Sequence, residues 1–292
     1  MARDLSLLIP ELVLAAAAML MIVAEMVRLP RLVLALGLAG LAAATVLTLS
    51  VLAADTTVFG GTYRIDLLSG WAKLILLPGT ALALLMARAE IAGKDREGSV
   101  YTLLCLVTLG ALMLAGGGDM MLLVLGVVLT GLGSFALVTY PRDDAATEAG
   151  MKYLVFGAVT GSVMIYGLGY KAALVPFHFW APDAYDGAPV SVAAYLSVIT
   201  KIAAIFAFAQ VLRDLPVSTG WPLVVALISA ATMTYGYLAA LVQTNLVRLI
   251  AYSSVAQSGY FLMGIVALGV SPLALPSIII FGAAYVAMNL GA

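Results

Sequence analysis

Four lysines lie inside strongly apolar stretches of this chain: Lys73, Lys152, Lys171 and Lys201. A charged side chain at the centre of a bilayer costs roughly 2.5–3.5 kcal/mol on insertion scales, and such residues usually belong to ion or proton paths. The alternative is a lysine near a helix end that extends its amine to the membrane surface. Both interpretations stay open for Lys73 and Lys152, whereas a proton path is favoured for Lys171 and Lys201.

The depth of Lys201 makes it the leading candidate for a proton-relay group. It lies twelve residues after Pro189, inside the apolar run 189–211. At 1.5 Å per residue this is ~18 Å of helix, which places the amine near mid-bilayer and too deep to reach the surface easily. A lysine withdrawn from water also releases its proton more readily than one in solution.

The segment from Lys171 to Pro189 cannot be one regular helix. Pro176 and Pro182 each remove a backbone donor and clash with the preceding turn. Irregular backbone at membrane depth is tolerated only where it is buried in protein or lines a watered cavity, and transporters use such broken helices at their sites. The sequence therefore predicts an interrupted helix at residues 171–182.

This segment also contains the only histidine of the chain, His178. Histidine is the side chain whose unperturbed pKa lies near neutral pH. Together with Lys171 and the carboxylates of Asp183 and Asp186, it could relay protons. Two alternatives remain: His178 is a hydrogen-bonded packing residue, and the aspartates are solvated loop residues or helix caps.

The elements that carry these residues are transmembrane helices. The chain has 292 residues, of which 64% are hydrophobic and 10% charged, with a mean hydropathy of +1.12. Soluble domains are about 25% charged. We therefore predict an all-α integral membrane protein, one polytopic domain over residues 1–292 with about eleven helices. Ten apolar runs are long enough, or nearly so, to span a bilayer: 5–27, 32–53, 67–87, 100–115, 120–139, 150–169, 189–211, 221–242, 246–268 and 273–290.

Composition also excludes several functions. One cysteine, Cys105, and one histidine cannot build a disulfide framework or a metal site. No phosphate-binding loop or dinucleotide fingerprint is present. A net charge of −1 gives no indication of a nucleic-acid partner. Energy for transport would therefore come from an ion gradient or from partner subunits.

Loop charges predict the orientation. Counted from the N-terminus, the odd loops among the first five hold six Lys and Arg residues, whereas the even loops and the N-terminus hold two. Positive residues favour the cytoplasmic side. We therefore expect the N-terminus outside.

A polar run from Arg248 to Tyr260 interrupts the apolar pattern near the C-terminal end. It contains Ser253, Ser254 and Ser258. Such hydroxyls can hold water or form hydrogen bonds between helices, and both remain open.

Three stretches of this sequence resemble the antiporter-like membrane subunits of respiratory complex I. They are Thr147-Glu-Ala-Gly-Met-Lys152-Tyr, Lys171-Ala-Ala-Leu-Val-Pro-Phe-His178-Phe-Trp-Ala-Pro-Asp183 and Asn245-Leu-Val-Arg-Leu-Ile-Ala-Tyr-Ser-Ser254. The residues of the second stretch and the N-terminal motif Leu7-Leu-Ile-Pro-Glu11 are most similar to the subunit N type of NADH-quinone oxidoreductase. The similarity extends over essentially the whole chain.

The resemblance implies a fold of fourteen helices with two inverted repeats, each with a broken helix. It implies proton translocation driven by quinone reduction in neighbouring membrane-arm subunits of a bacterial inner membrane, with no cofactor in this subunit. Lys152, Lys171 and Lys201 match the central-axis lysines of the family, and His178 lies beside them.

The sequence departs from the family pattern at several points. Val128 stands where the resemblance places a glutamate on the fifth helix, and Gln257 stands where a histidine is common. Only nineteen residues separate Lys152 from Lys171, so a segment is expected to be missing near Gly167-Leu168-Gly169. The chain ends at Ala292, before the second broken helix of the family.

Two other functions fit the same residues. One is a subunit of a cation/proton antiporter or of a membrane-bound hydrogenase, which belong to the same superfamily. The other is a structural membrane subunit that does not pump, which Val128 and the short spacing favour.

Overall fold

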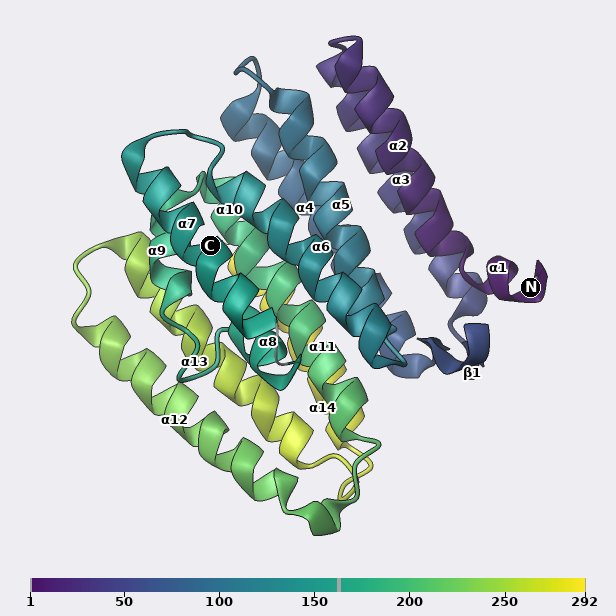
Figure 1. Ribbon diagram of the computed structural model, residues 1–292, viewed down its shortest axis with the longest axis vertical. Helices are drawn as coiled ribbons and strands as arrows, with labels where there is room; N and C mark the ends of the chain where they lie inside the picture. The colour runs from purple at the N-terminus through teal and green to yellow at the C-terminus, as the bar shows by residue number, and fades with distance from the viewer. Residues whose placement is uncertain (1, 162–163, 292) are drawn as a thin grey trace.

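The computed structural model describes residues 2–161 and 164–291, which fold into a bundle of long helices lying side by side (Figure 1). Proline at the first turn starts α2 and α3, where its missing N–H is not needed. Aspartates at the N-cap positions start α4 and α6. The helices of the first half are α1 (Ala2–Leu7), α2 (Ile9–Met26), α3 (Pro30–Val51), α4 (Leu67–Ile91), α5 (Glu97–Ala115) and α6 (Met120–Val138).

A short antiparallel hairpin separates α3 from α4. Its strands are β1 (Thr56–Val58) and β2 (Tyr63–Ile65), joined by the 3-10 turn η1 (Phe59–Gly61). The backbone N–H of Arg64 also donates to the carbonyl of Gly116, which joins the hairpin to the turn after α5. No sequence pattern predicted this hairpin, because each strand is only three residues long.

The second half contains the interrupted helices. The prediction of a broken helix is confirmed, since α8 ends at Lys171 and α9 begins only at Trp180. A π-helical turn, η2 (Leu196–Thr200), joins α10 to α11. The elements are α7 (Asp144–Gly161), α8 (Met164–Lys171), α9 (Trp180–Gly187), α10 (Val190–Tyr195), α11 (Lys201–Leu212), η3 (Val217–Thr219), α12 (Trp221–Leu241), α13 (Leu246–Val266) and α14 (Ala274–Gly291).

Gly167-Leu168-Gly169 lie inside α8, so the described chain runs through them without a break, and the family segment expected to be missing there stays a prediction. Helices α7 and α8 pack against each other, which brings Lys152 and Lys171 into the same half of the bundle despite their short separation. Residues 162 and 163, between the two helices, lie outside the described part.

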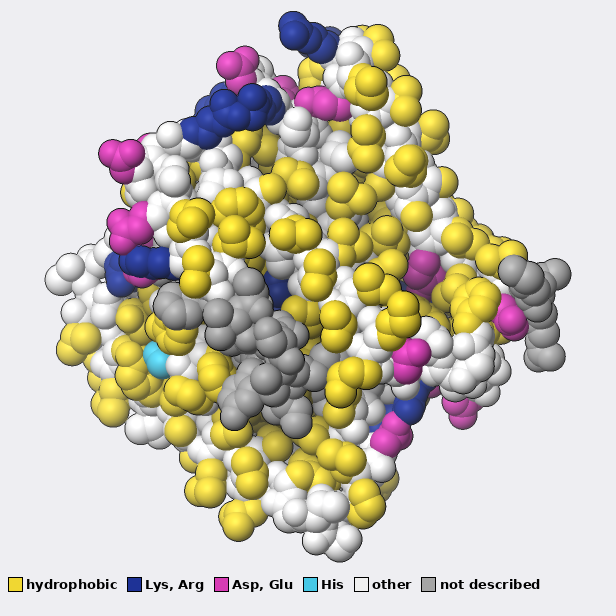
Figure 2. Space-filling model, viewed as in Figure 1, with side chains coloured by type: hydrophobic (Ala, Val, Ile, Leu, Met, Phe, Trp, Pro, Cys, Tyr) yellow, Lys and Arg dark blue, Asp and Glu magenta, His cyan; other side chains and the backbone are white. Residues whose placement is uncertain are grey.

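The prediction of an integral membrane helix bundle is confirmed. Among the described residues, nine helices are long and apolar enough to cross a bilayer. Figure 2 shows apolar side chains over most of the visible face, with Lys and Arg grouped near the top. In the most apolar stretch of the span Val190–Leu212, 94% of the residues are buried, so this span forms the centre of the bundle.

The two ends of the bundle differ in charge. We call the basic end the one that carries Arg28, Lys94, Arg96 and Arg142, which line two neighbouring hollows. We call the hairpin end the opposite one, formed by β1, β2 and the turn after α5. The basic loops predicted to lie on one side of the membrane therefore lie at one end of the bundle.

Candidate functional site

Lys201 is fully buried in the central span, at the start of α11. Its Nζ donates to the carbonyl of Ser254 at 2.8 Å and lies 2.5 Å from the Ser254 hydroxyl. The Ser254 hydroxyl is 2.9 Å from that of Tyr285 on α14. Ser254 on α13 therefore connects the Lys201 amine to α13 and, through Tyr285, to α14. This agrees with the expectation that serines of the polar run form hydrogen bonds between helices.

The π turn before Lys201 anchors the same network. The Tyr285 hydroxyl donates to the carbonyl of Ser197, which lies inside η2, at 3.0 Å. A π turn widens the helix and interrupts its regular bonding, and such turns are frequent at functional sites. The chain of contacts therefore runs from Lys201 through Ser254 and Tyr285 back to the helix that carries Lys201.

Lys171 ends α8 and is 1% exposed. Its Nζ donates to the Tyr153 hydroxyl at 2.5 Å and lies 4.8 Å from the centre of the same ring. Like Lys201, it has a hydroxyl as its partner, and no described carboxylate forms an ion pair with either amine. Both lysines are thus held in the core by neutral groups.

The helix position that faces Lys171 is Gly131 on α6. A Cβ added at Gly131 would lie 3.6 Å from Lys171 Nζ, in ordinary contact. Val128 is 48% exposed and so points away from the bundle. The residue aligned with the family glutamate therefore supplies no anion to Lys171, and its side chain does not face the lysine.

Two hydrogen bonds hold the broken segment in place. The Trp180 indole donates to the carbonyl of Tyr170 at 2.7 Å, which spans the interruption. The backbone N–H of Val175 donates to Thr232 on α12 at 3.2 Å. Backbone groups at the break are thus partly satisfied by neighbouring elements, as membrane depth requires.

A group of aromatic side chains lies between Lys171 and Lys201. The Tyr153 and Trp180 ring centres are 4.9 Å apart, and those of Trp180 and Tyr185 are 5.9 Å apart. The Tyr185 hydroxyl is buried and lies within interaction distance of the Ser254 side chain. The aromatic group therefore extends from Tyr153, the partner of Lys171, to the Ser254 network.

His178 lies in the break and is 8% exposed. Its ring packs on that of Tyr235, with centres 4.2 Å apart. Its Nδ1 is buried without a hydrogen-bond partner in the described part of the chain. His178 is therefore a packed residue with one ring nitrogen free, which is compatible with a relay.

Lys152 differs from the other three lysines. Its side chain is 41% exposed, and its Nζ pairs with Glu148 and Asp183, each at 2.9 Å. Asp183 also pairs with Arg248 at 2.9 Å, and Asp186 accepts from Asn245 at 2.8 Å. The structure thus places Lys152 in a charged group near the basic end, apart from the buried lysines.

Lys73 is fully buried, which excludes the interpretation that its amine reaches the surface. Its Nζ forms an ion pair with Glu11 of α2 at 2.6 Å. The sequence did not pair these residues, because 62 positions separate them in the chain. The Leu-Leu-Ile-Pro-Glu start was the only signal that Glu11 mattered.

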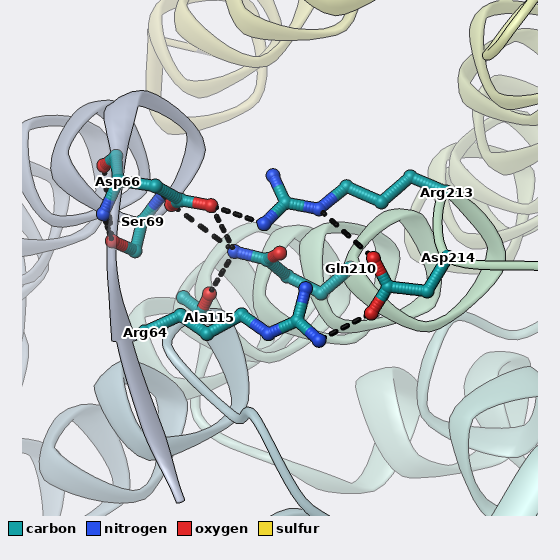
Figure 3. Close-up of polar contacts among 7 residues, drawn as sticks. All are labelled: Arg64, Asp66, Ser69, Ala115, Gln210, Arg213 and Asp214. Atoms are coloured by element: carbon teal, nitrogen blue, oxygen red, sulfur yellow. Dashed lines mark hydrogen bonds and ion pairs between the residues drawn. The ribbon is translucent and has the colours of Figure 1, made fainter. Parts of the chain in front are cut away.

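A polar network closes the hairpin end beside α11 (Figure 3). Asp66 pairs with Arg213, Arg64 pairs with Asp214, and the Gln210 amide lies between Asp66 and the carbonyl of Ala115. Burial alone would raise the pKa of the Asp66 carboxyl. The backbone N–H of Ser69 and the Arg213 charge outweigh burial, so that the pKa of Asp66 falls below its usual value.

Among the described residues, no group of histidine, cysteine and carboxylate side chains has the arrangement of a metal site. A polytopic bundle with a broken helix and three lysines in its core is instead built like a transporter.

Comparison with known proteins gives the family. Residues 158–292 match the family described as NADH:quinone oxidoreductase/Mrp antiporter, TM. NADH-quinone oxidoreductase subunit N of Magnetococcus marinus is 30% identical, over 99% of this chain and 70% of that protein. Subunit N 1 of Streptomyces griseus is 34% identical over 87% of this chain, which spans 63% of the relative's length.

A solved structure agrees with these relatives. A chain of respiratory complex I from Thermus thermophilus with bound aureothin superposes with a TM-score of 0.82. It is 27% identical, and the match covers 96% of this chain and 70% of that one. The chain described here belongs to the NADH-quinone oxidoreductase subunit N family.

Proposed function

We propose that this chain is a membrane-arm subunit of a complex I-type NADH-quinone oxidoreductase and contributes to proton translocation coupled to quinone reduction. The observation that carries the proposal is Lys201, a fully buried lysine in the central helix whose partners are neutral. Family membership supports the same role. Transfer of protons by these side chains needs no cofactor in this subunit.

The partners of the buried lysines suit a group that gains and loses a proton. A hydroxyl accepts a hydrogen bond from a charged ammonium and donates one to a neutral amine, after rotation of its hydrogen. Ser254 can therefore hold Lys201 in both states, and Tyr153 can do the same for Lys171. A carboxylate would instead favour the charged lysine alone.

The remaining site residues take places along the same route. His178, with one buried ring nitrogen free, would exchange protons through water in the broken segment. Lys152, half-exposed beside Asp183, is suited to exchange with the surface at the basic end. We place the basic end in the cytoplasm and the N-terminus outside, in the inner membrane of a bacterium, with other membrane-arm subunits as neighbours.

The test is Lys201→Ala in the assembled complex, in sealed vesicles. We expect fewer protons translocated per electron, with electron transfer to quinone retained. Lys94→Ala, which removes an exposed lysine, is the matched control and should change neither quantity. Unchanged translocation in Lys201→Ala would support a structural subunit instead.

A further inference from the structure

Lys73 and Glu11 form a buried ion pair that the proposed relay does not use. Lys73 on α4 is 0% exposed, and Glu11 on α2 is 7% exposed. Their charged atoms are 2.6 Å apart. The Tyr63 hydroxyl of β2 donates to the same Glu11 oxygen at 2.5 Å. An ionisable pair inside a membrane bundle is costly and is a functional candidate by default.

The pair is only partly satisfied. The second oxygen of Glu11 is buried and accepts no hydrogen bond from any described residue. The Lys73 ammonium has three donors, and its described contacts are the Glu11 oxygen and the face of the Tyr63 ring, whose centre is 5.2 Å away. A purely structural ion pair stabilises a fold only when its remaining donors and acceptors are also bonded. This pair leaves positions where a proton or a water molecule can bind.

The pair is close to the hairpin end. Glu11 is the third residue of α2, and Lys73 is the seventh residue of α4, so Lys73 lies about 10 Å along its helix. Tyr63 reaches it from β2. The next residue, Arg64, lines an open hollow together with Asp66, Asp119 and Arg213. The Tyr63 phenol thus connects Glu11 to the hairpin, whose next residue borders this hollow.

Hydroxyl groups extend from the same helix toward the central span. Thr80 lies two turns after Lys73 on α4, about 10 Å along the helix. The Thr80 and Thr108 hydroxyls are 2.8 Å apart, and those of Thr108 and Tyr195 are 2.7 Å apart. Tyr195 is the last residue before the π turn that carries Ser197. The row thus ends beside the Lys201 network.

We propose that Glu11 and Lys73 form a second proton-carrying pair, which exchanges protons between the hairpin surface and the buried Lys201 along the Thr80, Thr108 and Tyr195 hydroxyls. The proton passes from Lys73 Nζ to the Glu11 carboxylate, which leaves a neutral amine and a carboxylic acid. Uptake of one further proton by the Lys73 amine then gives an ammonium group beside a protonated Glu11, so that the pair carries one net positive charge. This inference rests on the proposed proton translocation and adds a place where the proton leaves or enters.

The first experiment asks whether Glu11 changes its protonation. Infrared difference spectra of the complex in membranes, recorded between resting and turning-over enzyme, should contain a carbonyl band of a protonated carboxyl group. Glu11→Asp should shift that band and Glu11→Gln should remove it. Glu25→Gln is the control, since Glu25 is on the same helix and bonds Ser99 near the basic end. Absence of any band that Glu11 variants move would overturn the proposal.

The second experiment tests the hydroxyl row by proton translocation per electron. Thr108→Val removes a hydroxyl that bonds two neighbours in the row, whereas Thr102→Val removes a buried hydroxyl on the same helix that donates to the Gly98 carbonyl. We expect loss of translocation only in Thr108→Val, and recovery in Thr108→Ser. Equal effects of the two valine variants would show a packing role.

The two proposals fail separately. If Lys201→Ala abolishes coupled translocation while the Glu11 variants move no infrared band, the second pair is wrong and the function stands. If Lys201→Ala has no effect, the function itself is wrong.

Discussion

At the scale of single residues, partners distinguish the four lysines better than depth does. Lys73 is neutralised by Glu11, Lys152 by Glu148 and Asp183, and Lys171 and Lys201 by no described carboxylate. Ion pairing favours one protonation state, whereas hydroxyl and carbonyl partners hold a lysine in place without fixing its proton. The two lysines with neutral partners are therefore suited to change charge singly, whereas the proposed exchange at Lys73 involves Glu11 as well.

Asp66 provides a prediction about stability and pH. Asp66→Asn keeps a side chain that can cap α4 but removes the charge that pairs with Arg213. We expect a loss of about 1.5–3 kcal/mol at neutral pH, the range for hydrogen bonds to charged groups. Because folding lowers the pKa of Asp66, its contribution is present above the pKa of the unfolded state and disappears as pH falls through the folded value.

The measurement is thermal unfolding of the detergent-solubilised protein at pH 7 and in strong acid. The parent and Asp66→Asn should differ at pH 7 and converge in acid. A constant difference at both values would contradict the argument. Asp119→Asn, which caps α6 and forms no described ion pair, is the control for the cap itself.

At the scale of elements, the π turn and the break at residues 172–179 bring the polar groups of the core together. Helix α11 continues from η2 without leaving the central span, so Lys201 stays fully buried. The Ser197 carbonyl within η2 accepts a hydrogen bond from the Tyr285 hydroxyl. In a regular α-helix this carbonyl would accept from a backbone N–H of the same helix. The irregular turns therefore provide acceptors where the apolar helices provide none.

Deletion of Ile199 tests this role of the π turn. A π turn contains one residue more than an α-helix needs, so its removal should restore regular bonding while the flanking helices keep their faces. We expect the complex to assemble and reduce quinone, with less proton translocation because Tyr285 loses its acceptor. Tyr285→Phe should reproduce the loss. Normal translocation in both variants would show that the turn serves packing alone.

At the scale of the whole molecule, charge is separated between the two ends of the bundle. The loops after α2, α4 and α6 carry Arg28, Lys94, Arg96 and Arg142, and the structure gathers them at one end. The N-terminus and the hairpin lie at the other end. Positive loops remain in the cytoplasm, so this separation predicts the orientation.

Cysteine labelling in intact cells measures the orientation. Thr57→Cys places a thiol on the exposed face of β1, and Lys94→Cys places one at the basic end. The native Cys105 is fully buried and should not react. We expect an impermeant reagent added outside to label position 57 and not position 94. The reverse pattern would invert the assignment.

The sequence by itself determined the class of the fold and the position of the interruption in residues 171–182. Long apolar runs specify membrane helices because each must bury its own backbone bonds, and Pro176 and Pro182 specify an interruption because proline removes a donor. It also identified Lys201 by depth alone, since a single helix converts residue number into distance. These inferences need only local geometry.

The partners of the lysines were decided by tertiary structure. Glu11 meets Lys73, and Ser254 meets Lys201, only because different helices pack side by side, and no local pattern encodes that meeting. The same holds for Gly131, the half-buried position of α6 that lies near the Lys171 amine, while Val128, one turn earlier, is exposed. Sequence fixes which side chains are polar and how deep they lie. Packing decides which of them contact one another.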